Sequence, residues 1–202
     1  MERRPAKSQG RKSRQDKLLK LIEKNPLLTD ERLAASLGAS VSTIRLDRAL
    51  LGVPELRERT RTMAQRATSR LRSLKQSEVV GDLLELEPNR WALSVLETKK
   101  DMAFRETDMV WDHYIYAQAS SIAIAVVEAD LVILDSMRGE YKGHARVGDS
   151  LVARAKVGVN MDEKYIVSVR TKVGEKEIFV GRFIAAVISP DRTVCGREGS
   201  SV

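Results

Sequence analysis

A chain of 202 residues, 43% of them apolar, is long enough to bury a core and to form one large or two small domains. It holds 35 Lys and Arg against 28 Asp and Glu, and only 12 Gly and 5 Pro, which excludes a collagen-like or low-complexity chain. The single cysteine, Cys195, excludes an internal disulfide framework and an all-cysteine zinc site, and it fits a reducing cytosol. No apolar run approaches the ~18 residues of a membrane span, and no apolar segment follows the basic N-terminus as in a secretory signal. We therefore expect a soluble, cytoplasmic protein that neither acts at a membrane nor holds a metal.

Positive charge is concentrated in the first third of the chain. Residues 1–75 contain 19 Lys and Arg against 8 Asp and Glu, a net charge of +11, whereas residues 76–202 carry a net charge of −4. Near Gln76 the sequence also changes from Leu, Ala and Arg, typical of helices, to Val and Ile, typical of strands. This asymmetry indicates that the first part binds a polyanion and that the second part has another task.

Residues 14–53 predict three short helices. The first ends before Pro26, because the residue that precedes a proline avoids the helical conformation. The second begins after Thr29, a good N-cap, and ends at Gly38, and the third is capped by Ser40. The apolar positions expected to face the core of these helices are Leu18, Leu19, Ile22, Leu33, Ala34, Leu37, Val41, Ile44 and Leu51.

Two helices joined by a tight glycine turn, the second rich in small polar and basic residues, are typical of a helix-turn-helix. An arginine bonds guanine bidentately in the major groove, hydroxyl groups contact bases or phosphates, and a helix N-terminus favours phosphate. A solvated helical bundle is the alternative, which the turn, the caps and the net charge disfavour. The predicted DNA-contacting residues are Ser40, Ser42, Thr43, Arg45 and Arg48 on the third helix, and Arg3, Arg4 and Arg14 on a basic N-terminal arm.

Two further basic segments flank this unit. The arm at residues 1–13 is too polar to fold alone, and it is either a solvated tail or a contact to the DNA backbone or minor groove. Residues 54–75 alternate arginines with apolar residues at helical spacing, which predicts an amphipathic linker helix. This linker would pack on a partner or on the second domain, and it would add phosphate contacts.

The second part of the chain predicts one long helix at residues 111–128 among several strands. The strand candidates are residues 79–86, 92–98, 131–134, 137–142, 151–159, 166–173 and 176–186. A helix followed by strands with short turns implies an antiparallel sheet curled round the helix, the hotdog arrangement. The fold class is therefore α + β, with a plain or winged-type helix-turn-helix before a hotdog domain. Because such a sheet has open edges, we expect a homodimer.

An enzymatic role needs a base or nucleophile near the start of the long helix. Asp108, Asp112 and His113 are placed there, but these are also ordinary cap and surface residues. No Ser/His/Asp constellation, glycine-rich phosphate loop or His/Cys metal set accompanies them. We therefore expect no catalytic residue. The alternative is a hotdog acyl-CoA thioesterase with a basic helical appendage for RNA or membranes.

The run TDERLAASLGASVSTIRLDRALLGVPELRER closely resembles the DNA-binding end of the FapR family, bacterial repressors of fatty-acid and phospholipid synthesis. The resemblance continues through AQASSIAIAVVE and VGDSLVARAKV to GRF at 181–183, and so covers about residues 14–186. It implies a dimer that binds an inverted repeat ahead of lipid-synthesis genes, with a non-catalytic hotdog domain that releases the DNA when malonyl-CoA binds. From the residues alone, an activator is the alternative to a repressor. The expected segments are the arm (1–13), the helix-turn-helix (14–53), the linker helix (54–75), the effector-binding and dimerisation domain (76–190) and a flexible tail (191–202).

The resemblance also implies ligand-binding residues, at which this chain departs from the family. The family has Arg-Gly at the start of the hotdog helix, where the arginine suits the malonyl carboxylate, and here those positions are Trp111 and Asp112. Asp112 would repel that carboxylate unless Arg105 or Arg138 compensates. Two hypotheses follow: the chain senses malonyl-CoA in a rearranged pocket, or it responds to another acyl-CoA or to none. A neutral acyl chain would suit Trp111 better than a dicarboxylate would, and no other cofactor is expected. The predicted ligand-binding residues are Phe104, Arg105, Trp111, Asp112 and Ser120.

Overall fold

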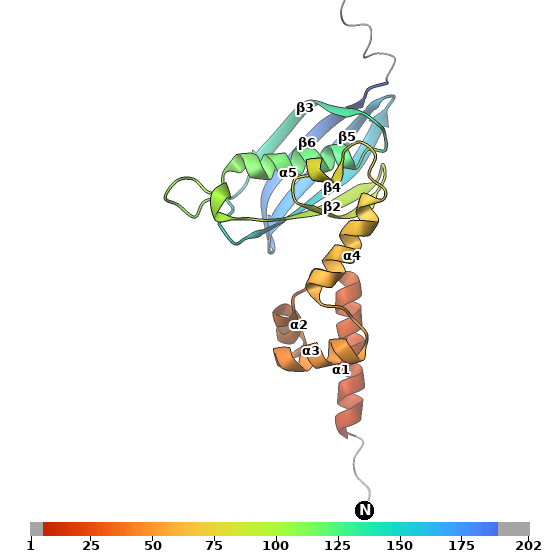
Figure 1. The fold of residues 1–202 in the computed structure, drawn as a ribbon, viewed down its shortest axis with the longest axis vertical. Coiled ribbons are helices and arrows are strands. Elements are labelled where there is room, and N and C mark those ends of the chain that lie inside the picture. The colour runs from red at the N-terminus through yellow and green to blue at the C-terminus, as the bar shows by residue number, and fades with distance from the viewer. Residues whose placement is uncertain (1–5, 190–202) are drawn as a thin grey trace, which may run out of the picture. The chain divides into compact units, whose positions relative to one another are not determined.

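The computed structural model describes residues 6–189 of the chain, which divides into two compact units, Met1–Met63 and Ala64–Val202. Arg3 and Arg4 of the predicted arm, Cys195 and the predicted tail lie outside the described residues. The first unit is built from helices and the second from a sheet and a helix (Figure 1). None of the helices within 6–189 is both long enough and apolar enough to cross a membrane.

The first unit contains the three predicted helices, α1 (Ala6–Lys24), α2 (Asp30–Leu37) and α3 (Val41–Leu50), and the start of α4 (Leu56–Thr68). The predicted caps are confirmed: the hydroxyl of Thr29 accepts a hydrogen bond from the amide of Arg32, and Gly38 closes α2 in the left-handed conformation, with φ of 60°. The described part of this unit contains no strand, so the helix-turn-helix is the plain type and not the winged one.

Helix α1 is longer than predicted. It begins at Ala6, so residues 6–13 of the expected arm are helical. Ala, Lys, Arg and Gln have high helix propensity, and the segment simply extends a helix whose later turns are anchored in the core. That core contains Leu18, Ile22, Leu33, Ala34 and Ile44, all of them predicted to face inward.

Helix α4 ends earlier than the predicted linker helix. It stops at Thr68, and residues 69–75 form turns before a short 3-10 helix, Gln76–Glu78. The hydroxyl of Ser69 donates to the carbonyl of Arg66, and the amides of Arg70 and Leu71 bond three residues back, a tightening that ends a helix. The amphipathic pattern therefore continued beyond the helix itself.

The second unit is a six-stranded antiparallel sheet with one helix, α5 (Asp112–Ala125), along one face (Figure 1). Its strands are β1 (Asp82–Glu87), β2 (Trp91–Glu97), β3 (Val132–Tyr141), β4 (Ser150–Met161), β5 (Lys164–Val173) and β6 (Lys176–Val187), and a 3-10 turn lies at Lys100–Met102. They lie in the order β1-β2-β4-β5-β6-β3. The predicted strands 131–134 and 137–142 are one strand, β3, with an irregularity in pairing between Leu134 and Ser136.

Helix α5 packs on the sheet through a stripe of small and branched residues. Ile115, Ala119, Ile122 and Ala123 are fully buried there, and the alanines allow the strands to approach closely. On the opposing strand, a Cβ added to Gly181 would lie 2.8 Å from the rings of Phe179 and Phe183, so the packing requires glycine at this position. The long helix predicted for residues 111–128 is confirmed, although it ends at Ala125.

Candidate nucleic-acid interface and candidate ligand site

Helix α3 presents one exposed face along its whole length. Ser42, Arg45, Leu46, Ala49 and Leu50 are exposed, and they follow the spacing of one helix face. Leu46 and Leu50 are 59% and 55% exposed, which is unusual for leucines in a small helical unit. Sequence reasoning missed both leucines, although the inward spacing of Val41, Ile44 and Leu51 already placed them outside.

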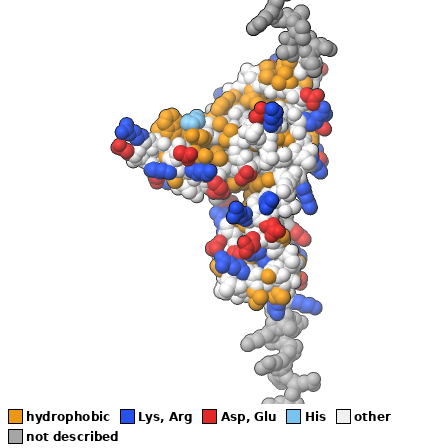
Figure 2. Space-filling model, viewed as in Figure 1, with side chains coloured by type: hydrophobic (Ala, Val, Ile, Leu, Met, Phe, Trp, Pro, Cys, Tyr) orange, Lys and Arg blue, Asp and Glu red, His pale blue; other side chains and the backbone are white. Residues whose placement is uncertain are grey.

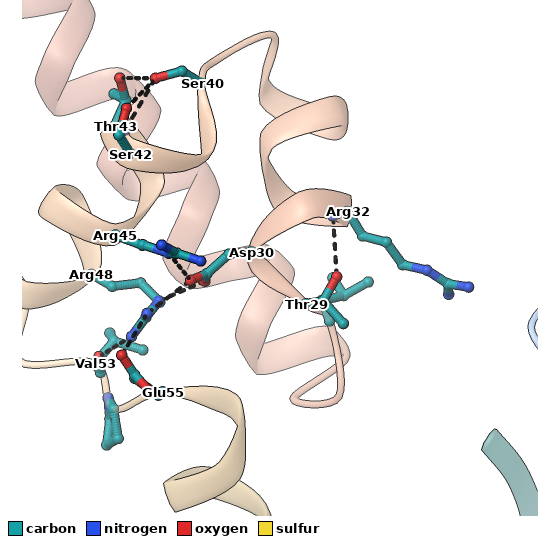
Figure 3. A network of polar contacts seen from close by, with 12 residues as sticks. Thr29, Asp30, Arg32, Ser40, Ser42, Thr43, Arg45, Arg48, Val53 and Glu55 are labelled. Atoms are coloured by element: carbon teal, nitrogen blue, oxygen red, sulfur yellow. Dashed lines mark hydrogen bonds and ion pairs between the residues drawn. The ribbon is translucent and has the colours of Figure 1, made fainter. Parts of the chain in front are cut away.

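The first turn of α3 is held by a network of hydroxyl groups. The Ser40 hydroxyl accepts from the amide of Thr43 at 3.2 Å and lies 2.9 Å from the Ser42 hydroxyl and 2.8 Å from the Thr43 hydroxyl (Figure 3). The network confirms Ser40 as the N-cap and fixes a helix N-terminus, which carries partial positive charge. Such a terminus suits a phosphate group.

Arg48 does not lie on the exposed face. Its residue is 4% exposed, and its guanidinium donates to both carboxylate oxygens of Asp30, at 2.7 and 2.9 Å, and to the Val53 carbonyl at 3.2 Å (Figure 3). The hydrogen bond from Arg48 holds the pKa of Asp30 below its usual value. The expectation that Arg48 faces outward is therefore wrong: one helical turn after Ile44, it faces α2 and joins the two helices.

Arg45, in contrast, is available. Its side chain is 63% exposed, and its Nε lies 3.4 Å from Asp30 Oδ2, a contact that orients the guanidinium without burying it (Figure 3). Arg45 is thus the one arginine of α3 that the unit leaves on its surface.

Asp47, which the sequence did not single out, ties α3 to α1. It is 1% exposed and accepts hydrogen bonds from Arg14 Nε at 2.7 Å and Gln15 Nε2 at 2.9 Å, with Arg11 Nε at 3.8 Å. Burial alone would raise the pKa of Asp47, but the bonds from Arg14 and Gln15 outweigh it and lower the pKa. Arg14, predicted to lie on a DNA-contacting arm, therefore lies in a helix and is bonded to α3.

Arg59, one of the arginines of the predicted linker helix, is also buried. The guanidinium of Arg59 in α4 donates to the carbonyls of Pro26, Leu28 and Pro54, at 3.1, 2.8 and 2.7 Å. Three carbonyl groups at the ends of two loops are satisfied by one side chain, so Arg59 stabilises the helix-turn-helix itself. It has no free surface for a phosphate.

In the second unit, an aromatic cluster lies at the start of α5. The rings of Phe104 and Trp111 stack with centroids 4.8 Å apart and 15° between their planes, and His113 meets Trp111 edge-on at 5.2 Å. Phe104 and Trp111 remain 40% and 43% exposed. Figure 2 shows hydrophobic side chains gathered beside a histidine in this unit. The structure thus brings together two of the predicted ligand-binding residues.

The other predicted ligand residues have different surroundings. Asp112 is the first residue of α5, and its backbone carbonyl accepts a hydrogen bond from the Tyr141 hydroxyl at 3.3 Å. The Ser120 hydroxyl donates to the carbonyl of Ala117 within the helix. The side chain of Arg105 is 94% exposed and lies 3.6 Å from a Glu106 carboxylate oxygen.

Arg138 lies on the wrong face of the sheet to compensate for Asp112. It alternates along β3 with Gly139, where an added Cβ would meet Phe179 of the core, so Arg138 is on the face away from α5. Neither arginine considered from the sequence is thus placed beside Asp112.

A pocket of about 410 Å³ opens beside the ends of β3 and β6. Its lining residues are Met109, Tyr141, Lys142, Gly143, His144, Arg146 and Lys176. No local pattern in the sequence indicated this pocket, because β3 and β6, whose residues form it, are distant in sequence.

The candidate catalytic residues are engaged in other contacts. Asp108 accepts two hydrogen bonds from Arg146 Nη1, at 2.8 and 2.7 Å, and this arginine holds the pKa of Asp108 low. An acid with a lowered pKa is a poor proton acceptor near neutral pH. Within the described residues, no three His, Cys, Asp or Glu side chains are grouped as metal ligands would be.

A plain helix-turn-helix joined to a sheet that wraps one helix defines a two-domain transcription regulator of the helix-turn-helix plus hotdog type. The transcription factor FapR of Thermoanaerobacter sp. (strain X514) is 42% identical over 178 residues, 88% of this chain and 89% of that protein. FapR of Bacillus subtilis (strain 168) is 37% identical over 177 residues, 86% of this chain and 94% of that protein. The chain therefore belongs to the FapR family of transcription factors, and the expectation that it is not an enzyme is confirmed by the names of these relatives.

Solved structures agree with the fold. Protein PH1136 of Pyrococcus horikoshii is 27% identical with a TM-score of 0.53, covering 55% of this chain and 85% of that one. The virulence protein Cj0977 of Campylobacter jejuni, at 21% identity, has a TM-score of 0.59 over 63% of this chain and 92% of its own, a likeness of fold alone. No family model matches the chain. The expected α + β fold class is confirmed.

Proposed function

We propose that this transcription factor represses genes of fatty-acid and phospholipid synthesis by binding duplex DNA through α3, and that an acyl-CoA bound to the hotdog domain releases it. The exposed face of α3 is the observation that carries the DNA-binding part. Its inner face is fixed by Asp47 to α1 and by Arg48 to α2, so the helix is a rigid element, as a recognition helix must be.

The exposed residues of α3 match what a major groove offers. The exposed guanidinium of Arg45 would bond guanine at two points, and the exposed Leu46 would give apolar contact to a thymine methyl group. Ser42 and the capped N-terminus at Ser40 and Thr43 suit phosphate oxygens. Base reading would thus rest on Arg45 and Leu46, while positioning rests on the helix start.

A homodimer would pair through β3. Within the described residues this strand pairs with no strand other than β6, and it exposes large apolar side chains at Ile133, Met137 and Tyr141. An exposed apolar edge strand is a template for pairing with a second copy, which would cover it. Two recognition helices related by twofold symmetry would read an inverted repeat with half-sites about one DNA turn apart.

The effector would bind by the aromatic cluster at the start of α5. The stacked rings of Phe104 and Trp111 provide an exposed apolar surface, and Asp112, which follows Trp111 in the chain and begins α5, carries a negative charge. A neutral acyl group fits these surroundings better than the malonyl carboxylate does. Because DNA and effector are linked, a coupling of ~2–3 kcal/mol between them is enough for a switch, and each ligand must weaken the other by the same factor.

A gel-shift titration tests this function. DNA from lipid-gene promoters that carries an inverted repeat should bind the full chain, and an acyl-CoA should release it. The same DNA with one half-site scrambled is the control and should bind much more weakly. Equal affinity for both DNAs would overturn the proposal.

A further inference from the structure

The sheet of the second unit has a basic face, opposite to the one that α5 covers (Figure 1). Ala155, Val169 and Phe183 belong to the buried core on the α5 side, so their neighbours along each strand point the other way. This concentration of cations is unexpected in residues 76–202, whose net charge is −4. The outward cations, all of them exposed, are together called the outer basic face: Arg138, Arg154, Lys156, Arg170, Lys172 and Arg182.

Two pairs of arginines oppose each other directly on this face. Arg138 is the partner of Arg182 across β3 and β6, and Arg154 is the partner of Arg170 across β4 and β5. The side chains of directly opposed residues lie on the same face and close together, and like charges at such positions destabilise a sheet. An anion held between the guanidinium groups would remove this repulsion. The opposed pairs therefore indicate a surface that binds anions.

Several of these cations are not engaged by the protein itself. Arg170 is bound to Glu177 at 2.9 Å, and Arg154 lies over the ring of Trp91, 5.1 Å from its centroid. Arg138, Lys156 and Arg182, in contrast, form no hydrogen bond or ion pair through their side chains with any described residue. The exposed Glu140, two positions along β3 from Arg138, likewise has no ion pair within residues 6–189. Three cations are thus available to an external anion.

The positions of these residues suit a chain of phosphates. One row across four neighbouring strands runs through Lys156, Ser168, Arg182 and Arg138. At ~4.8 Å between strands, the row spans ~14 Å. One strand of duplex DNA has a phosphate every ~3.4 Å of its axis, so it presents about four phosphates over that length. Arginine bonds phosphate oxygens at two points, and a serine hydroxyl also donates to them.

The apolar residues beside the cations disfavour other partners. Val152, Val180 and Ile184, at outward positions of the same strands, are half-buried between the longer basic side chains. A face that enters a lipid layer would expose large apolar groups, and a protein interface would have an apolar centre. Regularly spaced cations with short apolar neighbours are typical of a surface for a nucleic-acid backbone.

We propose that the outer basic face is a second contact for duplex DNA, which binds the phosphate backbone without regard to sequence. The proposal rests on the DNA-binding part of the proposed function, in which α3 reads the bases, and this face adds affinity that is common to all sequences. In a dimer paired through β3, the Arg138–Arg182 pairs of the two copies would lie on one continuous face.

Fluorescence anisotropy of the full chain with a labelled duplex that lacks the inverted repeat tests the outer basic face. Arg138→Gln with Arg182→Gln should weaken binding at least fivefold at 50 mM KCl. The slope of log affinity against log salt should become shallower by about 2, about 1 for each cation that leaves a phosphate. The double variant should melt no lower than wild type, because a like-charge pair has been removed.

Lys99→Gln with Arg105→Gln is the matched control. It removes the same charge from exposed positions outside the outer basic face, and it should keep the wild-type affinity and salt slope. A wild-type slope in Arg138→Gln with Arg182→Gln would overturn the proposal, and so would an equal loss in the control, since net charge alone would then explain the effect. A lower melting temperature in the double variant would also overturn it, because the arginines would then stabilise the sheet.

The remaining outcomes separate this proposal from its alternatives. Vesicles of phosphatidylglycerol that bind only when both arginines are present, with an unchanged salt slope for DNA, would assign the face to lipid and overturn the proposal. Preference for the inverted repeat without any effect of the two arginines would refute the outer basic face and leave the proposed function intact. DNA binding that depends on the two arginines, without preference for the inverted repeat, would support the outer basic face and refute base reading by α3.

Discussion

The guanidinium of Arg48 donates two hydrogen bonds to the carboxylate of Asp30, and this pair joins the second half of α3 to the first turn of α2. The angle between the two helices of the helix-turn-helix depends on it, as does the position of Arg45, which approaches the same carboxylate from outside. Arg48, which the sequence suggested as a DNA contact, thus helps to position Arg45.

Arg48→Ala is therefore expected to destabilise the helix-turn-helix. Removal of one partner of a fully buried ion pair costs about 3–5 kcal/mol, but Asp30 keeps 16% exposure of its side chain, so we expect a loss of about 2 kcal/mol. Urea denaturation followed by far-UV circular dichroism measures it. Arg45→Ala on the same helix is the matched control and should change stability by less than about 0.5 kcal/mol. Equal losses in the two variants would contradict this role for Arg48.

Arg45→Ala should have the opposite profile: a stable fold with weaker, less selective DNA binding. If Arg45 bonds a guanine, its removal costs ~1–3 kcal/mol on the operator and relaxes the preference at that base pair. Arg45→Lys should recover little of the selectivity, because an ammonium group lacks the two-pronged geometry. Footprinting and gel shifts on the operator and on single-base variants report both effects. An unchanged affinity and footprint would remove Arg45 from the interface.

The two arginines show which parts of the site the sequence can predict. The caps at Thr29 and Ser40 and most of the inward apolar positions depend on local spacing and were predicted correctly, although Leu21 packs against the core where Leu19 was expected. The partner of Arg48 is 18 residues away, so only its spacing from Ile44 gave a local signal of burial. The sequence placed Arg48 on the outside because it is charged. Residue type alone does not show that an acid, Asp30, lies opposite this arginine inside the unit.

The second unit shows the same division between local and distant signals. Stretches rich in Val and Ile between turn residues predicted the strands, among them β5 and β6. The pocket lined by Lys142 and Lys176 could not be predicted, because these residues become neighbours only through the pairing of β3 with β6. The 102–111 loop likewise brings Phe104 against Trp111 through backbone bonds that no periodicity encodes.

Acid should destabilise the first unit. The pKa of Asp30 is lowered by its bonds to Arg48, and that of Asp47 by Arg14 and Gln15 against the effect of burial. A carboxylate with a lowered pKa in the folded state stabilises the protein above its unfolded pKa of about 3.9, and this contribution is lost as pH falls through the lower, folded value. We therefore expect the melting temperature to be flat from pH 7 to 5 and to fall below about pH 4.

Asp47→Asn tests whether Asp47 contributes to this fall in melting temperature at low pH. The variant should melt lower than wild type at pH 7, because the charge-assisted bond from Arg14 is lost, but its melting temperature should change less below pH 4. Glu23→Gln, at an exposed position on α1, is the control and should follow the wild-type curve. If the melting temperature of Asp47→Asn fell below pH 4 as much as that of the wild type, Asp47 would not contribute to the loss of stability in acid.

The free edge of β3 gives a prediction for assembly. Met137→Asp places a charge on an exposed apolar position of this edge, and it should convert a dimer into a monomer in sedimentation equilibrium. Affinity for the inverted repeat should fall at least tenfold, because the two half-sites then bind separate molecules. Val159→Asp, on β4 and 60% exposed in the wild type, is the control and should remain dimeric. A dimeric Met137→Asp would place the interface elsewhere.

The residues at the start of α5 predict which acyl group the protein prefers. Asp112 puts a negative charge near the stacked rings of Phe104 and Trp111, so acetyl-CoA or a longer acyl-CoA should bind at least tenfold more tightly than malonyl-CoA. Replacing both residues with the family pair, Trp111→Arg with Asp112→Gly, removes the repulsion and adds a guanidinium that bonds a carboxylate at two points. Calorimetry should then show the order reversed, with malonyl-CoA bound more tightly than acetyl-CoA.

Trp111→Leu with Asp112→Gly is the control for the added guanidinium. It removes the negative charge without adding an arginine, so the two ligands should become closer in affinity without a preference for malonyl-CoA. Malonyl-CoA bound as tightly as acetyl-CoA by the wild-type protein would show that another cation reaches the carboxylate and that Asp112 does not set the preference.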